Sequence, residues 1–475
     1  MNKPTTIASR RRFLKTSASA FGFTFIPAYL TPARGKANPK LPPSRRINLG
    51  CIGVGGRAGG VIPSLTRDGS AVPVAFCDVD FSDSNKRKGN LETWPDVPRF
   101  NDFRVMFDKM AGDIDAVSVV TPDHTHFVAA IHSMSLGKHV YVEKPLTHTF
   151  EESEILMRAE KKYKVVTQMG NQGHTSAGAE QMKQIVAAGL ADDITRIEAW
   201  KEPSSWFMQA DKRISEYPKE EPLPQGFSSW ELWCGPQKVR PFSKRYHPGS
   251  WRAFHQYGCG MFGDWGCHII DFAHHYLKLG LPTEITPVRL DDHNKVIFPL
   301  SSHIRFSFPK RGPGLPMIEL MWKAGADCFP EIDEKFGDKQ DDGTTKLPEL
   351  SNAGTVLHRK QGDYLILRGH HAAASRIYPR EKMLEHTETM KAKRGEFGHG
   401  ASFIQACMGN TTTESPFSIA GELTQVLNLG MIAELLNEDL NFNPKTKRFK
   451  RNDKANFLLS GPDPRPEWAH YYKMA

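Results

Sequence analysis

The chain has few cysteines, and their arrangement excludes one class of protein. The seven cysteines stand at positions 51, 77, 234, 259, 267, 328 and 407, and no CxxC pair occurs. Seven cysteines, an odd number, in a chain of 475 residues do not suggest a disulfide framework, although one disulfide is possible. Cys51 and Cys77 lie in apolar runs, so we expect them to be buried thiols of a sheet.

The chain also lacks long runs of basic residues outside its N-terminus. Residues 1–37 hold seven cations and no acids, and the remainder holds 55 basic and 53 acidic side chains, a net charge of +2 against +9 for the whole. No basic run in the remainder is long enough to follow a phosphate backbone. We therefore expect no nucleic-acid partner.

Long apolar runs are absent as well. The apolar stretch 16–30 is interrupted by Gly22 and Pro27 and is too short to span a bilayer. It follows Ser-Arg-Arg-Arg-Phe-Leu-Lys at residues 9–15, the pattern of a twin-arginine export signal. We expect residues 1–37 to be that signal, cleaved near Ala37–Asn38, and the mature protein to be a soluble periplasmic or otherwise exported protein without a stable membrane span.

Internal repeats and low-complexity blocks are absent too, and what remains is an alternation of short apolar runs with helix-length segments. After a linker at 38–45, the sequence predicts strands at 47–52, 72–77, 116–120, 140–142 and 165–169, with helices at 58–67 and 127–136. This order is typical of a doubly wound parallel sheet, which we place at residues 46–170.

The second domain, residues 171–475, is predicted with less regular spacing. Strands are expected at 194–200, 303–308 and 318–322, and helices at 266–277 and 419–436. Residues 331–360 are polar and are expected to form a surface loop.

A glycine-rich turn, Gly53-Val-Gly55-Gly56-Arg57, follows the first strand and precedes a helix. Glycines there allow the backbone to approach a pyrophosphate at the helix N-terminus. Asp78, at the end of the second strand, is placed to accept hydrogen bonds from ribose hydroxyls and to repel a 2′-phosphate. The pattern predicts an NAD site, and a solvated strand-end acid is the alternative for Asp78.

Two further clusters follow strand ends of the predicted parallel sheet, where ligands bind. Thr121-Pro122-Asp-His124-Thr-His126 could contact the nicotinamide end, although each histidine alone is also a common helix-cap or surface residue. In Glu143-Lys144-Pro145, both Glu143 and Lys144 are expected to contact the cofactor, and the lysine could also stabilise negative charge on a reacting oxygen. A surface lysine is the alternative.

The last cluster, 263–275, contains Asp264, His268, Asp271 and His275 at helical spacing on one face. Asp264 and His268 suit a general base that is oriented by a carboxylate. Four metal ligands on such a face would spread over about 16 Å, too far for one ion, so we assign no metal. Hydrogen bonding in the core is the expectation for Asp271 and His275.

These motifs in this order resemble the Gfo/Idh/MocA oxidoreductases, which include glucose–fructose oxidoreductase and inositol dehydrogenase. The resemblance covers residues 47 to about 440. It implies an α/β fold with an N-terminal Rossmann doubly wound parallel sheet and a C-terminal α/β domain with a large open, mainly antiparallel sheet. It also implies that Lys144, Asp264 and His268 are catalytic and that the sheet forms a homo-oligomer. The signal and the segments 168–174 and 230–236 resemble the exported branch, where Asn171 and Gln172 would contact substrate.

The leading hypothesis is an NAD-dependent oxidoreductase of a carbohydrate or cyclitol hydroxyl with a tightly bound cofactor. His268 would take the hydroxyl proton, Asp264 would orient His268, and Lys144 would polarise the oxygen. Loop residues suited to a pyranose face are Trp206, His247, Trp251, Arg252 and His255, with ordinary aromatic packing as the alternative.

Two other hypotheses stay open. One is an NAD-dependent glycosidase that works by transient oxidation, elimination and re-reduction, without the usual two carboxylic acids. The other, a non-catalytic sugar-binding protein, fits poorly with the intact set of Lys144, Asp264 and His268.

Overall fold

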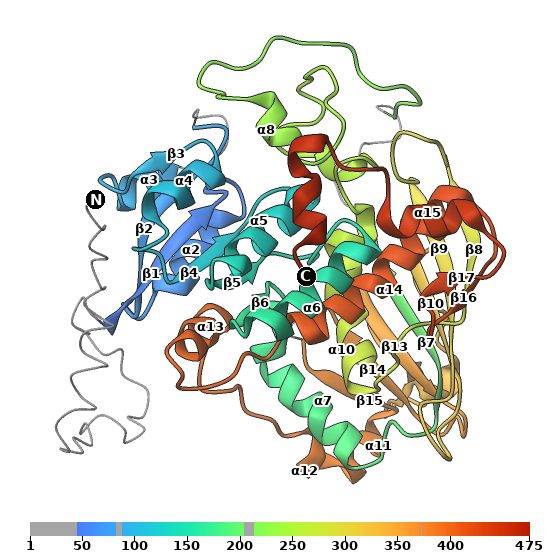
Figure 1. Cartoon of the computed structure of the whole chain (residues 1–475). Coiled ribbons are helices and arrows are strands. Elements are labelled where there is room, and N and C mark those ends of the chain that lie inside the picture. The colour runs from blue at the N-terminus through green and yellow to red at the C-terminus, as the bar shows by residue number, and fades with distance from the viewer. Residues whose placement is uncertain (1–44, 82–87, 204–212, 372) are drawn as a thin grey trace, which may run out of the picture.

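The computed structural model describes residues 45–81, 88–203, 213–371 and 373–475, so the predicted export signal and Trp206 lie outside the described residues. An N-terminal sheet layered with helices stands beside a larger sheet formed by the second half of the chain (Figure 1). The C-terminus returns between the two and lies near α5 and α6, where the hydroxyl of Tyr163 donates to the carbonyl of Met474 at 2.8 Å.

The N-terminal sheet is parallel and has the order β3-β2-β1-β4-β5-β6, which confirms the doubly wound prediction. Its strands are β1 (Ile47–Ile52), β2 (Ala71–Cys77), β3 (Arg99–Phe100), β4 (Ala116–Val119), β5 (His139–Val142) and β6 (Thr167–Met169). The helices of this half are α2 (Ala58–Thr66), α3 (Lys88–Thr93), α4 (Phe103–Met110), α5 (Asp123–Ser135) and α6 (Phe150–Tyr163). Every residue of β4 and β6 is buried, as expected for strands covered by helices on both faces.

The second sheet has nine strands in the order β15-β14-β13-β7-β10-β9-β8-β16-β17, and only the β7–β10 pair is parallel. Its strands are β7 (Ile194–Lys201), β8 (Glu284–Asp291), β9 (Ser301–Phe308), β10 (Ile318–Ala324), β13 (Ala353–Arg359), β14 (Leu365–Gly369), β15 (Ser375–Tyr378), β16 (Leu440–Asn443) and β17 (Arg448–Phe449). In β10, Leu320 and Trp322 are buried while Glu319 is exposed, so the strand alternates between core and outer face.

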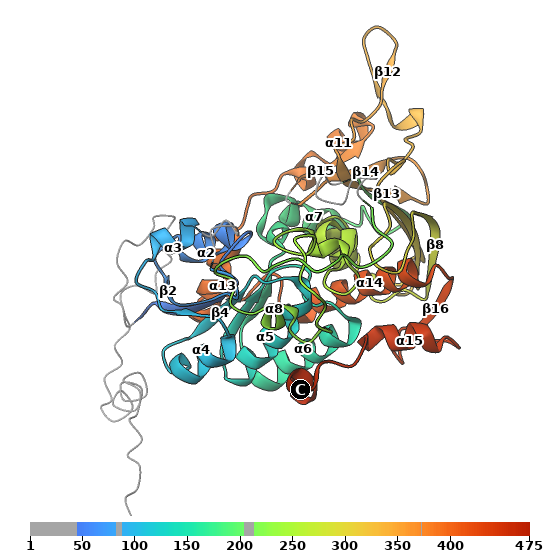
Figure 2. The ribbon, with the colours of Figure 1, turned by 90° about the horizontal axis from the view of Figure 1, so that it is seen from above.

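The prediction of a surface loop at 331–360 is wrong at its C-terminal end. Residues 353–359 form β13, which pairs with both β7 and β14 in the middle of the sheet. Only the hairpin β11 (Asp338–Lys339) and β12 (Thr345–Lys346) projects from the body (Figure 2). The polar composition of 331–352 obscured the apolar run that begins at Ala353.

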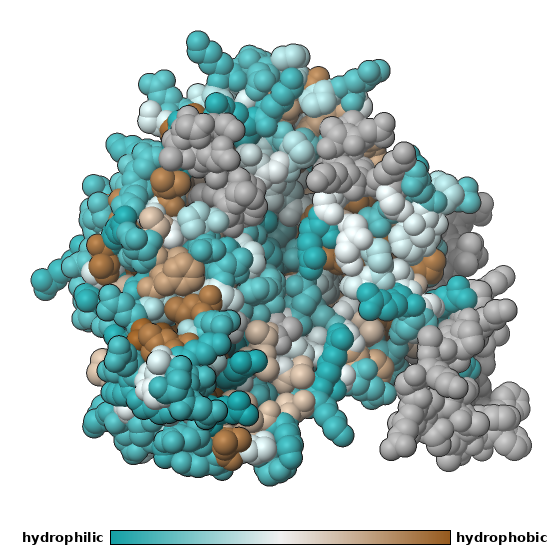
Figure 3. All heavy atoms as spheres, turned by 180° about the vertical axis from the view of Figure 1, so that it is seen from behind, coloured by the Kyte–Doolittle hydropathy of each residue, from teal (hydrophilic) through white to brown (hydrophobic). Residues whose placement is uncertain are grey.

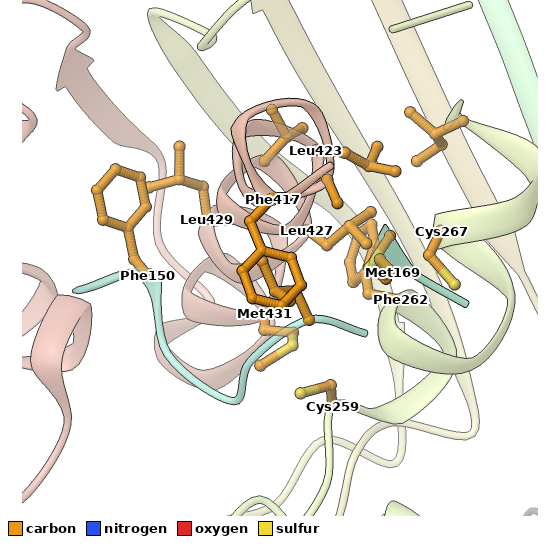
Figure 4. Close-up of a cluster of buried hydrophobic side chains, with 14 of the residues drawn as sticks. Phe150, Met169, Cys259, Phe262, Cys267, Phe417, Leu423, Leu427, Leu429 and Met431 are labelled. Atoms are coloured by element: carbon orange, nitrogen blue, oxygen red, sulfur yellow. The ribbon is translucent and has the colours of Figure 1, made fainter. Parts of the chain in front are cut away.

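Helix α14 (Phe417–Leu436) lies between the two halves and is largely buried. In Figure 4 its side chains meet Met169 of β6 and Phe262 of the segment that carries Asp264. The approach is close, because a Cβ on Gly430 would lie 2.6 Å from the ring of Phe262. Among the described residues, α14 is the one helix long and apolar enough to cross a membrane, and 78% of its apolar window is buried within the protein.

The remaining helices belong to the second half of the structure, and α13 also packs against the N-terminal domain. They are α7 (Ala177–Ala187), α8 (Trp230–Cys234), α9 (Cys267–Ile269), α10 (Asp271–Tyr276), α11 (Arg380–Glu385), α12 (Thr387–Met390), α13 (His399–Cys407) and α15 (Asp453–Ser460), with short 3₁₀ or π turns η3 (Gln172–Thr175), η5 (Ser250–Ala253), η6 (Phe262–Gly266), η7 (Glu334–Phe336) and η8 (Pro466–Lys473). Phe403 and Ile404 of α13 pack in one core with β1 and α2.

All seven cysteines are free, and six of them are buried, including Cys51 and Cys77. The disulfide that the sequence left open is not formed. Seen from behind, the surface is largely hydrophilic and is hollowed near its centre (Figure 3).

Candidate active site

A cavity of about 370 Å³ opens at the carboxyl ends of the parallel strands. It is lined by nearly all of the residues that the sequence assigned to a nucleotide, namely Gly53, Gly55, Gly56, Arg57, Asp78, Thr121, Pro122, Glu143 and Lys144. The glycine turn, the acidic strand end and the lysine therefore belong to one site.

Gly53 shows why the turn needs glycine. Its φ is +81°, and a Cβ there would lie 2.4 Å from the carbonyl oxygen of Val120. Its amide donates to the carbonyl of Cys77 at 2.8 Å, which holds the turn against β2. The backbone beside the N-terminus of α2 therefore carries no side chain at this position, and a pyrophosphate can approach it closely.

The carboxylate of Asp78 is held in place at the cavity wall. It accepts from the amide of Val54 at 3.0 Å and from the amide of Asp80 at 3.1 Å. A carboxylate fixed at this strand end suits the ribose hydroxyls of NAD and opposes the 2′-phosphate of NADP. The fold, the bare turn and this acid fit NAD.

Residues 227–257, here called the cover segment, form the opposite wall. Trp233, His247, Trp251 and Arg252 of this segment line the cavity. His247 pairs with the buried Asp80 at 2.8 Å between Nε2 and Oδ2, and so joins the segment to the N-terminal domain. The sequence predicted that His247, Trp251 and Arg252 contact a sugar, and the structure places all three on the wall of the same cavity as the nucleotide residues.

Trp468 of η8 also lines the cavity, together with Phe103 of α4. The guanidinium of Arg104 lies 4.4 Å from the Trp468 ring centroid. Nothing in the local sequence near residue 468 signals this role, because a contact between residues so far apart in the chain depends on the fold.

The two histidines after β4 have a different role from the predicted one. The ring nitrogens of His126 lie 2.7 Å from the carbonyl oxygen of Pro145 and 2.8 Å from that of Thr121, and His126 does not line the cavity. His124 approaches the carbonyls of Trp233 and Tyr257 of the cover segment at 2.7 and 3.1 Å. Both rings hold loops together and neither reaches the cofactor side.

Lys144 is fixed by Asp264. Its ammonium donates to the carboxylate of Asp264 and to the same residue's carbonyl, each at 2.7 Å. Gly263 allows this approach, since a Cβ there would lie 3.0 Å from Cγ of Pro145. The two predicted catalytic residues are thus a direct ion pair on the cavity wall.

Arg252 extends this ion pair to a second acid. Its Nε lies 3.6 Å from Asp264 Oδ1, and its Nη1 donates to Asp123 Oδ1 at 3.0 Å. Burial opposes ionisation of Asp264, but Lys144 and Arg252 outweigh it and lower the pKa of its carboxyl. Asp264 therefore stays charged and keeps Lys144 directed into the site.

His268 is buried near this pair but does not line the cavity, and it is not oriented by Asp264, in contrast to the prediction. Among the described residues, no hydrogen bond joins Asp264 to His268. The reason is local, because residues 262–266 form a π turn with a wider repeat than an α-helix, so the two side chains lose the expected four-residue alignment.

The partner of His268 is another histidine. The ring of His371, from the loop after β14, lies 3.9 Å from the His268 ring between centroids, and Trp265 flanks both. Burial, and then the charges of Lys144 and His371, lower the pKa of His268 well below its ordinary value. His268 is therefore neutral at physiological pH and able to accept a proton.

Asp271 takes part in buried hydrogen bonds, as expected. It accepts from Asn171 Nδ2 at 3.0 Å and bonds His174 Nε2 at 2.9 Å. Gln172 donates to Glu143 at 3.1 Å, so Asn171 and Gln172 support the site's acids. Within the described residues, no group of three His, Cys, Asp or Glu side chains could hold a metal ion.

His255 lies away from the site. It lines a separate cavity of about 80 Å³ with His148 and Phe298, and its Nε2 lies 3.2 Å from the carbonyl of Asn294. Its assignment to a sugar face is not supported by this position.

The chain is similar to known proteins in two ways. Residues 47–171 match the Gfo/Idh/MocA model, described as an oxidoreductase family with an NAD-binding Rossmann fold. A "Glycosyl hydrolase family 109 protein" of Shewanella pealeana is 28% identical over 209 residues, 40% of this chain and 45% of the relative. The "scyllo-inositol 2-dehydrogenase (NAD(+))" of Bacillus subtilis is 33% identical over 103 residues, 22% and 28% of the two chains.

The fold extends further than the sequence similarity. The WlbA dehydrogenase of Chromobacterium violaceum, solved with NADH and UDP-GlcNAcA, has a TM-score of 0.55 and 13% identity, and the match covers 84% of this chain and 96% of that one. This chain spans less than half the length of each of the two curated relatives described above.

Proposed function

We propose that the chain is an NAD-dependent oxidoreductase of a carbohydrate or cyclitol hydroxyl, and the match of residues 47–171 to the NAD-binding Rossmann model of the Gfo/Idh/MocA oxidoreductases supports this proposal. The observation that carries the proposal is the Lys144–Asp264 ion pair on the wall of the nucleotide cavity. This pair supplies a fixed cation on the cavity wall, and a cation there supports chemistry at a hydroxyl oxygen.

The chain's own residues supply the acid–base part of the reaction. Bound NAD supplies the hydride acceptor. Lys144 donates to the reacting oxygen and stabilises the negative charge that develops on it. His268, neutral and buried beside Lys144, accepts the hydroxyl proton. Asp264 acts on Lys144 and fixes the direction of its ammonium.

The substrate class is proposed from the wall opposite the glycine turn. Trp251 and Arg252 both line the cavity, and the Arg252 guanidinium lies 4.4 Å from the Trp251 ring centroid. An indole and a guanidinium are groups suited to a polyhydroxylated ring. The relatives whose names include an inositol dehydrogenase and a "Levoglucosan dehydrogenase" support the same class.

The test is a sugar panel on purified protein with its own nucleotide. Release and quantification of bound nucleotide gives the NAD content, and each sugar or cyclitol is then added to the intact holoenzyme. Growth of the NADH absorbance band with at least one compound is the expected result. A protein with neither bound nucleotide nor turnover would contradict the proposal.

A glycosidase that uses NAD transiently is the second candidate, supported by the relatives named as glycosyl hydrolase family 109 proteins. The same panel extended with aryl glycosides separates the two reactions. Aglycone release without net NADH would favour the second candidate, and NADH formation without aglycone release favours the first.

We also propose that the protein is exported in folded form by the twin-arginine route, carrying its cofactor. Support comes from Arg10–Arg12 in the sequence and from the cover segment, which lines the cavity and is joined to the N-terminal domain by the His247–Asp80 pair. Fractionation of cells producing wild-type and Arg11→Lys/Arg12→Lys chains tests it, since the variant is expected to remain in the cytoplasm.

A homo-oligomer through the nine-stranded sheet is proposed as well. Its outer face carries exposed charges of both signs, such as Arg305 and Glu319, whose side chains are 42% and 47% exposed, and these charges could pair with a second copy. Sedimentation analysis would give a mass above that of one chain.

A further inference from the structure

A further cavity, of about 230 Å³, lies behind the glycine turn. It is enclosed by α2, η3 and α13 together with the loop before α13. Its volume equals that of roughly seven or eight water molecules at about 30 Å³ each, enough for a small organic molecule. None of the roles assigned above uses it.

The charge of this cavity has one sign. Arg57, Arg67 and Arg394 line it, and none of the described residues along its wall is acidic. Neither Arg67 nor Arg394 has a hydrogen bond or ion pair with another described residue. Arg67 and Arg394 therefore have guanidiniums free of described partners on the wall that Arg57 also lines. Such a set favours an oxyanion, because the N–H groups of a guanidinium match the oxygens of a carboxylate or phosphate.

His399, also on the wall, adds a polar group that lacks a partner. The side chain is 6% exposed, its Nε2 donates to the carbonyl of Met169 at 2.8 Å, and its Nδ1 is buried without a hydrogen bond. Burial lowers the pKa of His399 to about 4, so the ring is neutral and Nδ1 is an acceptor. A buried acceptor calls for a donor such as a hydroxyl.

We propose that this cavity binds a small hydroxylated anion, a sugar acid or a sugar phosphate, at a site separate from the catalytic one. The guanidiniums of Arg67 and Arg394 bind its carboxylate or phosphate oxygens, and His399 accepts a hydrogen bond from one of its hydroxyls. The side chains of Ser64 and Thr175 complete the polar wall.

Arg57 connects this anion site to the catalytic site, because it lines both cavities. Its Nε lies 3.4 Å from Glu143, the neighbour of Lys144, while its Nη1 lies over Gly60 on the other side. An anion bound to Arg57 competes with Glu143 for the guanidinium. Binding at this site therefore changes the contacts of Glu143, the residue next to the catalytic lysine.

The test is calorimetric titration of the NAD-loaded full chain with glucuronate, glucose 6-phosphate, inorganic phosphate and glucose. Glucuronate or glucose 6-phosphate is expected to bind at least tenfold more tightly than glucose and more tightly than phosphate. The double variant Arg67→Ala/Arg394→Ala is expected to weaken that binding at least tenfold. Both side chains are exposed, so the variant's unfolding midpoint without ligand should match that of the wild type.

Two controls separate this site from the catalytic one. Arg448→Ala, an exposed arginine on β17, should leave binding unchanged, and so should Lys144→Met. The proposal would be overturned if glucose bound as tightly as the two anionic sugars, or if inorganic phosphate bound more tightly than they do. It would also be overturned if the double variant bound them as the wild type does, or if Lys144→Met lost binding. Because binding alone is measured, these outcomes do not depend on whether the chain oxidises sugars.

Discussion

Glu434 of α14 offers a quantitative test of the buried core behind the catalytic segment. The side chain is 3% exposed, and among the described residues no cation pairs with it. Burial raises the pKa of its carboxyl from 4.5 to about 8. The folded protein therefore holds a proton at Glu434 that the unfolded chain releases above pH 4.5.

The pH dependence follows from the direction of this shift. A raised folded-state pKa gives stability that is complete below pH 4.5 and is lost as the pH rises to 8. At about 1.4 kcal/mol per pKa unit, the loss is about 2 kcal/mol at pH 6 and about 5 kcal/mol above pH 8. Glu434→Gln cannot ionise at this position. The difference in the free energy of unfolding between the variant and the wild type should therefore grow in favour of the variant across this pH window, by the same amounts.

Urea unfolding of both proteins at pH 5, 6, 7 and 8.5 measures the effect. The exposed Glu422→Gln on the same helix is the control and should show no such trend. A Glu434→Gln advantage that stays constant or shrinks as the pH rises would refute the reasoning.

Three further predictions concern the site. Gly53→Ala should abolish bound NAD in the purified protein, because the new Cβ would meet the carbonyl of Val120 at 2.4 Å, whereas Gly59→Ala, with open space around it, should keep a full complement; equal NAD content in both would contradict the turn's role. Asp78→Ser should lower the affinity for NAD and raise that for NADP at least tenfold relative to it, measured by fluorescence titration of nucleotide-free protein, and an unchanged preference would remove Asp78 from cofactor selection. The lowered pKa of His268 keeps its ring neutral in mild acid, so the acid limb of kcat/KM should have its midpoint below pH 6.5, and a midpoint above that value would exclude His268 as the base.

The parts of the site that the sequence predicted depend on short segments. β1 and the turn at Gly53 are local, since an apolar strand followed by glycines specifies both the strand and the bend. β1 occupies the predicted range, and Asp78 stands at the strand end as expected. Lys144 follows its strand for the same reason.

The parts that the sequence missed depend on tertiary contacts or on a departure from regular geometry. The prediction that Asp264 orients His268 assumes a regular α-helix. Because residues 262–266 form a π turn, the Asp264 carboxylate instead accepts a hydrogen bond from Lys144. His371 contacts His268 from the loop after β14, and Trp468 lines the cavity from the C-terminal segment. No spacing in the sequence reports such contacts.

The central claim is that Lys144, held by Asp264, promotes hydride transfer to NAD within this cavity. Rapid mixing of the holoenzyme with a reactive sugar measures the first turnover directly as NADH absorbance. With equal NAD bound, Lys144→Met should form NADH at least a thousandfold more slowly than the wild type, because the developing charge on the oxygen loses its cation, a loss on the order of 4 kcal/mol. An unchanged first-turnover rate in Lys144→Met would contradict the account.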